Sequence, residues 1–344
     1  MYYIRPIAMT DLDTLCQIAR ESGPGFTSLP DNSELLEQKI GRSLAALAPA
    51  HSALTNQSYL FVLVKHETEQ VVGTCGIESA VGMDYPWYHY RLGTVVHASP
   101  ELNVYNRFKT LYLCNDYTGC SEVCTLYLKP DHRRHHNGAL LSKSRFLFMA
   151  AQPERFSERV IAEMRGFSDE HGHSPFWDGL GQRFFSIDFS KADYLTGSGN
   201  KAFIAELMPK YTIYLHLLPE SAQAVIGRVH PATEPAKAML ESEGFRFENY
   251  VDIFDAGPTV TAPLKKIRTI RQSRCARVQI NPSPTSKLFP EYLLSNEKLS
   301  EFRCVFAPAR EHGGNVDLSP DVAAILQVGE GDAIRIVELK GGQA

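Results

Sequence analysis

The stretch LKPDHRRHHNGALLSKSRF, residues 128–146, places two arginines and three histidines directly before an apolar run with helical spacing. The pattern predicts a strand over 122–128 and a helix over 138–151. Positive side chains at a helix N-terminus are unfavourable, because the helix dipole already concentrates positive charge there. A bound anion removes this cost, since free backbone N–H groups at that end prefer phosphate. The layout therefore predicts a turn that holds a pyrophosphate between a strand and a helix.

Two other interpretations of this cluster remain open. His132, His135 and His136 could ligate zinc as neutral imidazoles, but adjacent histidines point apart on a helix. The chain has no HExxH pattern and no suitably spaced carboxylate. The second alternative is a solvated basic helix start with no function. We expect no metal site here.

The composition of the whole chain limits the possible functions. The 344 residues suggest two or three domains, and the 44% hydrophobic content allows a large core. A net charge of -4 gives no general attraction to nucleic acid, so we expect no nucleic-acid partner. No apolar run reaches the roughly 18 residues of a membrane span. Seven scattered cysteines and the lack of a signal-peptide core predict a cytoplasmic protein with reduced thiols and no membrane contact.

Hydrophobic spacing predicts alternating helices and strands before residue 275. The predicted helices cover 11–20, 34–47 and 138–151, and the predicted strands cover 2–6, 58–64, 71–79, 122–128 and 159–165. The stretch SPFWDGLGQRFF predicts a short helix that ends at Gly181, followed by an aromatic strand. A helix near 235, a glycine and another aromatic strand repeat this order. Chance is a serious alternative explanation, because helix–Gly–strand junctions are common.

We interpret this weak repeat as two related α/β halves. The predicted divisions are 1–190, which carries the quoted turn, 191–274, and 275–344. Beyond 274 the sequence is broken by prolines and holds short strand-like pieces, so the last part is predicted to be small and mostly β.

The quoted turn resembles the coenzyme-binding segment of the GNAT superfamily of acyl-CoA N-acyltransferases. That segment follows the pattern R/Q-x-x-G-x-G/A. Here Arg133 to Gly138 fits it, with His136 in place of a glycine. The resemblance implies an α/β (α+β) fold of the GNAT type and assigns coenzyme contacts to Arg133, Arg134, Asn137 and Gly138. The departure at His136 would narrow the approach to the phosphates.

A closer resemblance covers residues 1–275. The runs TSLP, DYPWYHYRLGTVVHASPELNVYN, NDYTGCSE, LLSKSRFLFMA, EMRGFSDEHGHSPFW, FIAELMPKY, GRVHP and NYVDIFDAGPT are similar to the arginine N-succinyltransferase family. The resemblance implies transfer of succinyl from succinyl-CoA to the α-amine of L-arginine in arginine catabolism, with no permanently bound cofactor. An arginine/ornithine succinyltransferase α-type subunit is the close alternative. The family also implies a homo-oligomer or a hetero-oligomer with a paralogous subunit.

The same resemblance assigns two further residues. It makes His230, in GRVHP, the catalytic proton donor, and it places a succinyl-CoA contact at Leu126. His230 precedes a proline and lies in a loop before a predicted helix, where catalytic groups often occur. Its rivals among the twelve histidines are His97, His171 and His173.

Several substrate contacts stay open from sequence. An arginine would suit the succinyl carboxylate, and a carboxylate would suit the guanidinium of the acceptor. The candidates are Arg91, Arg107 and Arg165 for the first role, and Glu78, Asp84, Asp169 and Glu170 for the second. Cys124 is predicted to be a buried, inert thiol, which favours direct attack by the amine. A catalytically silent CoA-binding subunit and a metal hydrolase are the alternative functions.

Overall fold

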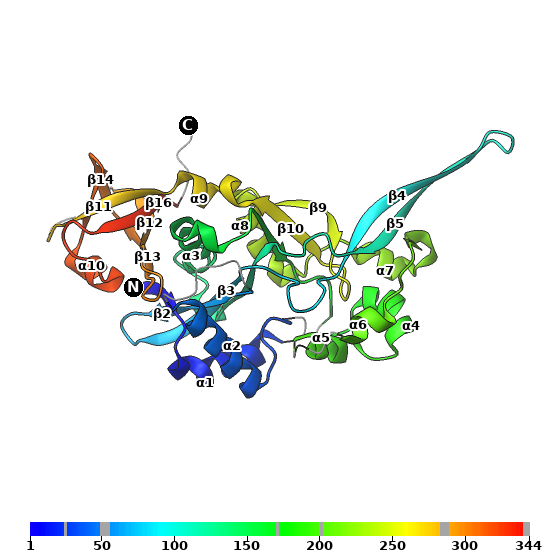
Figure 1. Ribbon diagram of the computed structural model, residues 1–344, viewed down its shortest axis with the longest axis horizontal. Coiled ribbons are helices and arrows are strands. Elements are labelled where there is room, and N and C mark those ends of the chain that lie inside the picture. The colour runs from blue at the N-terminus through cyan, green and yellow to red at the C-terminus, as the bar shows by residue number, and fades with distance from the viewer. Residues whose placement is uncertain are drawn as a thin grey trace.

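The described strands of the chain join one mixed sheet with helices on both faces (Figure 1). The computed structural model describes residues 1–23, 26–48, 56–169, 172–197, 199, 202–282 and 289–339. Seven strands form the centre of the sheet in the spatial order β1 (Tyr2–Pro6), β2 (Ser58–Lys65), β3 (Gln70–Glu78), β6 (Ser121–Leu128), β7 (Arg159–Glu163), β10 (Pro258–Pro263) and β9 (Arg246–Val251). Within this group β6 and β7 pair in parallel and all other neighbours are antiparallel. The predicted α/β fold is confirmed.

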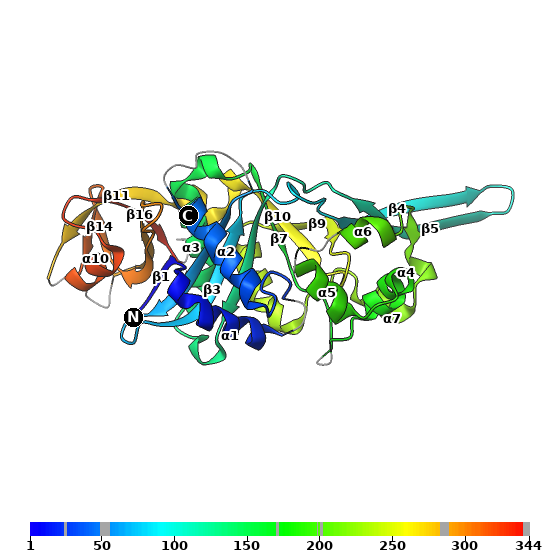
Figure 2. The same cartoon turned by 60° about the horizontal axis from the view of Figure 1, so that its bottom comes forward.

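Four helices cover the two faces of this central sheet (Figures 1 and 2). α1 (Leu12–Ser22) and α2 (Ser33–Ala46) lie on one face, and α3 (Asn137–Ala151) and α8 (Glu234–Ser242) lie on the other. β2 is buried on both faces: Phe61 and Leu63 pack with α3, and Leu60 and Val62 pack with α1 and α2. This arrangement explains its continuous apolar sequence, which is typical of a strand with helices on both sides.

Six strands continue the sheet beyond β1. They come from the C-terminal part of the chain: β13 (Cys304–Pro308), β12 (Glu291–Asn296), β16 (Ala333–Glu338), β11 (Arg274–Ile280), β15 (Asn315–Leu318) and β14 (Arg310–His312). One helix, α10 (Pro320–Leu326), packs there, and α9 (Arg268–Gln272) precedes β11. This part of the chain is mostly β, as the sequence predicts.

A long hairpin extends from the other end of the molecule (Figure 2). Its strands are β4 (His89–Ser99) and β5 (Val104–Cys114), paired along their whole length. The hairpin meets the rest of the sheet at its base, where β4 pairs with β9 and β5 pairs with β8 (Ile213–Tyr214). Four short helices pack near this base: α4 (Gln182–Phe185), α5 (Phe189–Gly197), α6 (Ala202–Leu207) and α7 (Glu220–Val225). We refer to residues 92–109 as the arm.

The predicted helix end at Gly181 is wrong. Residues Trp177–Gly181 form a π-helical turn that continues directly into α4, so the predicted aromatic strand is helical. Gly181 has ordinary right-handed backbone with φ -57, and a Cβ there would overlap the ring of Trp177. The glycine therefore serves packing. The helix ends at Ser186, which takes φ 54.

The later predicted unit has the expected order, because α8 is followed by Gly244 and β9. However, β9 and β10 extend the same sheet as β1, β2 and β3. Residues 191–274 therefore share one sheet with residues 1–190. The division into two GNAT-like halves, with a third part at 275–344, stays a prediction.

Candidate active site

The parallel strands β6 and β7 stay together only at their first residues. Their ladder pairs Ser121 with Val160 and Glu122 with Ile161. β6 continues to Leu128 and β7 to Glu163, but the described ladder between them ends at Glu122. The strands therefore diverge, and past Glu122 the described parts of their facing edges do not pair with each other. We call this region the V between β6 and β7.

A β-bulge lies on the β6 side of the V. The ladder between β3 and β6 pairs Gly76 with Cys124 and Thr74 with Tyr127, so one residue of β3 faces two of β6. Thr125, within the bulge, takes φ 54. Bulges recur next to active sites, because they bend the strand and change the direction of its backbone groups.

Leu126 presents its backbone to the V. The N–H of Lys129 donates to Val72 O of β3 at 2.9 Å. Backbone groups of successive residues in a strand alternate in direction. Tyr127 therefore also faces β3, whereas Leu126 and Leu128 face the opposite edge. An extended ligand can pair with this edge as an added strand would, which is the contact that the sequence assigned to Leu126.

The N-terminus of α3 is suited to an anion. His135 and His136 both have left-handed backbone, with φ 50 and 61, and α3 begins directly after them. Among the described residues, the backbone N–H groups of His135, His136, Gly138 and Ala139 donate to no protein acceptor. The first turn carries no acidic residue. Free N–H groups and the positive end of the helix dipole together form a phosphate site.

The left-handed backbone at His136 explains why glycine is usual there in the GNAT pattern. The exposed His136 ring turns toward the C-terminal part of the chain, and its centroid lies 5.6 Å from that of Phe306.

The four predicted coenzyme residues divide into two groups. Arg133 Nε donates to Leu128 O at 3.0 Å, which fastens the turn to the end of β6. Asn137 is buried, and its Nδ2 donates to His132 O at 3.0 Å. These two residues shape the turn. Arg134 is exposed and, in the part of the chain that the structure describes, its side chain makes no hydrogen bond or ion pair, so it and the N–H of Gly138 are available to a ligand.

His230 lies on the β7 side of the V. The N–H of Met164 donates to Pro258 O of β10 at 3.1 Å. Because backbone groups alternate, the next residue, Arg165, directs its carbonyl to the other edge, which faces β6. That carbonyl accepts the N–H of His230 at 2.9 Å. A bridge between Gly166 and Val229 continues this pairing. The segment that carries His230 is thus held on the edge of β7 that faces Leu126.

A hydrogen bond to the ring of His230 defines which ring nitrogen carries the hydrogen. Its Nδ1 accepts the N–H of Ala232 at 3.2 Å. A neutral ring in this bond carries its hydrogen on Nε2. Partial burial and the nearby charge of Arg165 lower the pKa of His230 below its ordinary value. His230 therefore stays neutral at physiological pH and offers Nε2–H as a donor, a pattern in which a neutral imidazole polarises a carbonyl.

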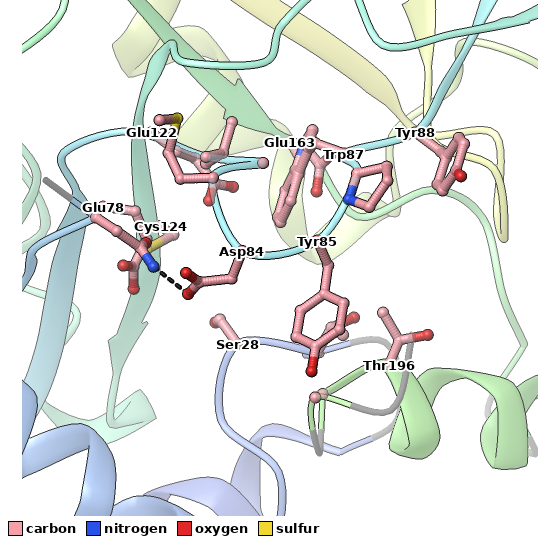
Figure 3. Close-up of a pocket in the computed structure, with 18 of the residues that line it drawn as sticks. Ser28, Glu78, Asp84, Tyr85, Trp87, Tyr88, Glu122, Cys124, Glu163 and Thr196 are labelled. Carbon is pink, nitrogen blue, oxygen red and sulfur yellow. Dashed lines mark hydrogen bonds between the residues drawn. The ribbon is translucent and has the colours of Figure 1, made fainter. Parts of the chain in front are cut away.

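A cavity of about 430 Å³ lies beside β6 and β7 on the face of the sheet that α2 covers. Figure 3 shows residues that line it. Glu122 and Cys124 of β6 and Glu163 of β7 are among its lining residues. Five carboxylates line it in all: Glu78, Asp84, Glu122, Glu163 and Asp252. Lys39 and Arg42 are the two basic residues in the lining. The excess of acidic groups favours a cationic ligand.

Both basic residues of the cavity are paired with the same carboxylate. Lys39 Nζ and Arg42 Nη2 each lie 3.5 Å from an oxygen of Glu78. Glu78 faces Glu122 directly in the ladder between β3 and β6. Like charges in directly opposed positions repel, so the pair needs cations nearby. The aromatic residues Tyr85, Trp87 and Tyr88 line the same wall (Figure 3).

Glu163 contacts two ring nitrogens at the edge of this cavity. Trp87 Nε1 donates to Glu163 Oε1 at 3.1 Å, and His89 Nε2 lies 2.9 Å from the same oxygen. Burial lowers the pKa of His89 to about 4, so this imidazole is neutral near pH 7 and does not cancel the charge. Sequence reasoning missed Glu122, Glu163 and Asp252, because their meeting depends on the order of the strands.

The structure separates the other sequence candidates. Glu78 and Asp84 line the cavity, where Asn56 donates to Asp84. Asp169 lies in an exposed loop, while Glu170 and His171 lie outside the described residues. His97 and Arg107 are on the arm, and His97 bonds Tyr214. His173 is exposed.

The histidine cluster and Cys124 have local explanations. The ring nitrogen Nδ1 of His132 lies 3.0 Å from Tyr2 Oη. Among the described residues, no group of three or more His, Cys, Asp or Glu side chains could hold a metal ion. Burial raises the pKa of the Cys124 thiol, which disfavours the thiolate needed for nucleophilic attack.

A parallel strand pair that diverges beside a helix start with free N–H groups is the arrangement typical of an acyltransferase with a GNAT-like fold. Residues 2–269 match the family described as arginine N-succinyltransferase beta subunit, and residues 274–338 match its C-terminal domain. The chain belongs to the arginine N-succinyltransferase family.

Curated relatives are similar to this chain over nearly its full length. The chain is 51% identical over 339 residues to the arginine N-succinyltransferase of Escherichia coli strain 55989, covering 98% of each chain. It is 50% identical, with the same coverage, to that of Citrobacter koseri. A solved structure of arginine/ornithine succinyltransferase subunit AI from Pseudomonas aeruginosa superposes with a TM-score of 0.90 at 38% identity, covering 99% of each chain. In the described part of this chain, no helix is long and apolar enough to cross a membrane.

Proposed function

We propose that the chain transfers the succinyl group of succinyl-CoA to the α-amine of L-arginine, giving N2-succinyl-L-arginine and CoA in arginine catabolism. The observation that carries the proposal is the acidic cavity lined by Glu122 of β6 and Glu163 of β7, the two strands that form the V. A cationic amino acid in this cavity would meet a thioester held between β6 and β7. Membership of the arginine N-succinyltransferase family supports the same substrates.

The residues suggest how the reaction proceeds. The diphosphate of succinyl-CoA binds the free N–H groups at the start of α3 and the side chain of Arg134. The pantetheine arm pairs with the backbone of Leu126. The neutral α-amine attacks the thioester carbon directly, and the C–S bond then breaks to release the CoA thiolate. The proton that the new amide nitrogen loses passes to this thiolate or to solvent. Nε2–H of His230 donates a hydrogen bond to the departing sulfur or to the oxygen that gains charge. Succinyl-CoA is a co-substrate here, and we propose no permanently bound cofactor.

A crossed steady-state assay tests this proposal. Arginine and ornithine are each paired with succinyl-CoA and with acetyl-CoA, and release of free CoA thiol is measured. We expect the highest kcat/KM for arginine with succinyl-CoA. A preference for ornithine would instead favour the α-type subunit alternative, and no turnover with any pair would favour a silent CoA-binding chain.

Arg134→Ala is expected to raise the KM for succinyl-CoA about tenfold, because an exposed charge-assisted contact to phosphate is lost. The KM for arginine should not change. The effect should shrink at high salt, because mobile ions screen exposed charges. Exposed Arg183, in α4, supplies the control Arg183→Ala. An unchanged KM for succinyl-CoA in Arg134→Ala would place the diphosphate elsewhere.

Glu163→Gln is expected to raise the KM for arginine about 30-fold, because the cavity loses a carboxylate that neighbouring His89 does not neutralise. Glutamine preserves the shape and can still accept the bond from Trp87. The KM for succinyl-CoA serves as the internal control and should stay within about twofold of wild type. A rise in both constants would mean that the substitution disturbs β7 rather than acceptor binding.

We also propose that the chain forms an oligomer with copies of itself or with a paralogous subunit. The arm supports this, since an isolated two-stranded hairpin is only marginally stable in water and Leu102 and Tyr105 at its tip are largely exposed. Sedimentation of the purified chain measures the state directly. A cytoplasmic location is proposed as well, and the seven free cysteines agree with a reducing compartment.

A further inference from the structure

Arg165 follows β7 by two residues and holds His230 through its backbone. Residues 163 and 165 are alternate positions at the end of β7, so their side chains leave the same face of the strand. Glu163 lines the acidic cavity. The backbone carbonyl of Arg165 accepts the N–H of His230 at 2.9 Å. Arg165 is therefore held directly beside the proposed catalytic histidine, and its charge acts on that ring.

The guanidinium of Arg165 has donors without acceptors. Its Nη2 donates to Ser168 Oγ at 3.1 Å, which is the one hydrogen bond that this side chain makes to the described residues. Its Nε is buried and has no partner. Asp255 and Asp193 attract it, but neither lies within ion-pair distance. A partly buried cation with unused N–H groups is costly unless an anion binds it.

Other cations near the site are already engaged or lie elsewhere. Lys39 and Arg42, in the cavity, are paired with Glu78. Arg91 is exposed at the base of the hairpin, with its guanidinium carbon 5.8 Å from the centre of the Tyr250 ring. Arg107 is exposed on the arm. Among the three arginines that the sequence suggested for the succinyl carboxylate, Arg165 is the one beside His230.

We propose that the guanidinium of Arg165 binds the free carboxylate of the succinyl group and thereby selects a dicarboxylic acyl donor over acetyl-CoA. This inference rests on the proposed function. The succinyl carboxylate is two methylene groups from the thioester carbonyl. A thioester beside His230 therefore places this carboxylate next to the residue whose backbone holds His230. The planar guanidinium matches the two oxygens of a carboxylate in a bidentate contact.

The test compares Arg165→Met and Arg165→Lys with wild type, using succinyl-CoA, acetyl-CoA and free CoA. Arg165→Met should lower kcat/KM for succinyl-CoA about 100-fold, because one partner of a desolvated charge pair is removed. The value for acetyl-CoA should stay within about threefold of wild type. Arg165→Lys keeps the positive charge but cannot make the bidentate contact of a guanidinium. Its kcat/KM for succinyl-CoA should fall about tenfold. Equilibrium binding should show weaker affinity for succinyl-CoA and unchanged affinity for CoA.

A matched control is Arg159→Met. Arg159 lies on the same strand at an alternate position, where it forms an exposed ion pair with Glu248 at 3.1 Å. It should leave the preference between donors unchanged. Equal losses with succinyl-CoA and acetyl-CoA in Arg165→Met would overturn the proposal, because they would show that Arg165 only positions His230. No loss with either donor would overturn it too. A wild-type protein that does not succinylate arginine would instead refute the proposed function, whatever the variants do.

Discussion

Replacing His230 with alanine is expected to lower kcat for succinyl transfer about a thousandfold, while the affinity for CoA should change little. A positioned group in acid–base catalysis typically contributes about 10²–10⁴-fold. Nδ1 of His230 accepts the N–H of Ala232, which leaves Nε2–H as the donor. We expect CoA affinity to depend on other groups, namely the start of α3 and the backbone of β6. Rapid-mix kinetics give kcat, and equilibrium titration gives the Kd of CoA.

Two variants sharpen this result. His230→Gln keeps an N–H donor of similar reach but has no imidazole ring. Its kcat should be about tenfold higher than that of His230→Ala. His173→Ala, at an exposed histidine that the sequence left as a rival, should behave as wild type. A His230→Ala enzyme that retains most of its turnover would remove the imidazole from the mechanism. A parallel loss of CoA affinity would show that the substitution damages the coenzyme site instead.

The pH dependence of kcat follows from the lowered pKa of His230. A lowered pKa means that the imidazole stays neutral down to a pH below its ordinary value of 6.5. The active neutral form is therefore lost only below that pH, so the acid limb of the kcat profile should lie below 6.5. In Arg165→Met this limb should move upward, since one of the two causes of the shift is removed. If the acid limb of wild type lay above pH 6.5, the pKa of His230 would not be lowered, and the assignment of a neutral ring as the active form would be contradicted.

The sequence could predict the elements whose burial follows a clear period. β1 spans the predicted residues, and β2, β3, β6 and α3 differ from their predicted ends by one residue. β2 was identifiable because both its faces are covered, which leaves a continuous apolar run. The arm escaped prediction for the opposite reason. Most residues of β4 and β5 beyond the base are exposed on both faces, so no alternation marks them as strands.

The site was only partly predictable for a related reason. The turn before α3 is local, so its residues were all found from one short stretch. The acidic cavity draws on β3, β6, β7 and the loop before β4, which are distant in sequence. Glu122 and Glu163 look like ordinary strand residues until the order β3-β6-β7 places them together. Their role depends on tertiary pairing, which hydrophobic periodicity does not reveal.

The second large effect concerns stability. Glu243→Ala is expected to lower the free energy of unfolding by about 3–5 kcal/mol, because it leaves buried cations without their anion. Glu243 is 1% exposed. Its Oε1 lies 3.0 Å from both Lys143 Nζ and Arg268 Nη2, and its Oε2 accepts the N–H of Thr269 at 2.7 Å. The carboxylate thus joins α3, the end of α8 and α9, which together support the coenzyme turn.

A surface pair on the same helix supplies the control. Glu241 forms an exposed ion pair with Lys237 at 2.8 Å, and such pairs contribute about 0.3–0.5 kcal/mol. Glu241→Ala should therefore change the midpoint of urea unfolding only slightly, whereas Glu243→Ala should shift it strongly. If both variants lost equally little stability, the buried network would be unimportant for folding.

Acid titration gives an independent check on Glu243. Burial alone would raise the pKa of Glu243, but the charges of Lys143 and Arg268 outweigh burial and hold the pKa below its ordinary value of 4.5. A carboxylate with a lowered folded pKa stabilises fully above its unfolded pKa, and this stability is lost as the pH falls through the folded value. Wild type should therefore lose stability below about pH 4.5 more steeply than Glu243→Gln, which has no group to titrate there. Equal slopes in the two proteins would mean that the unfolded and folded states bind this proton equally, and the network would then not stabilise the fold through its charge.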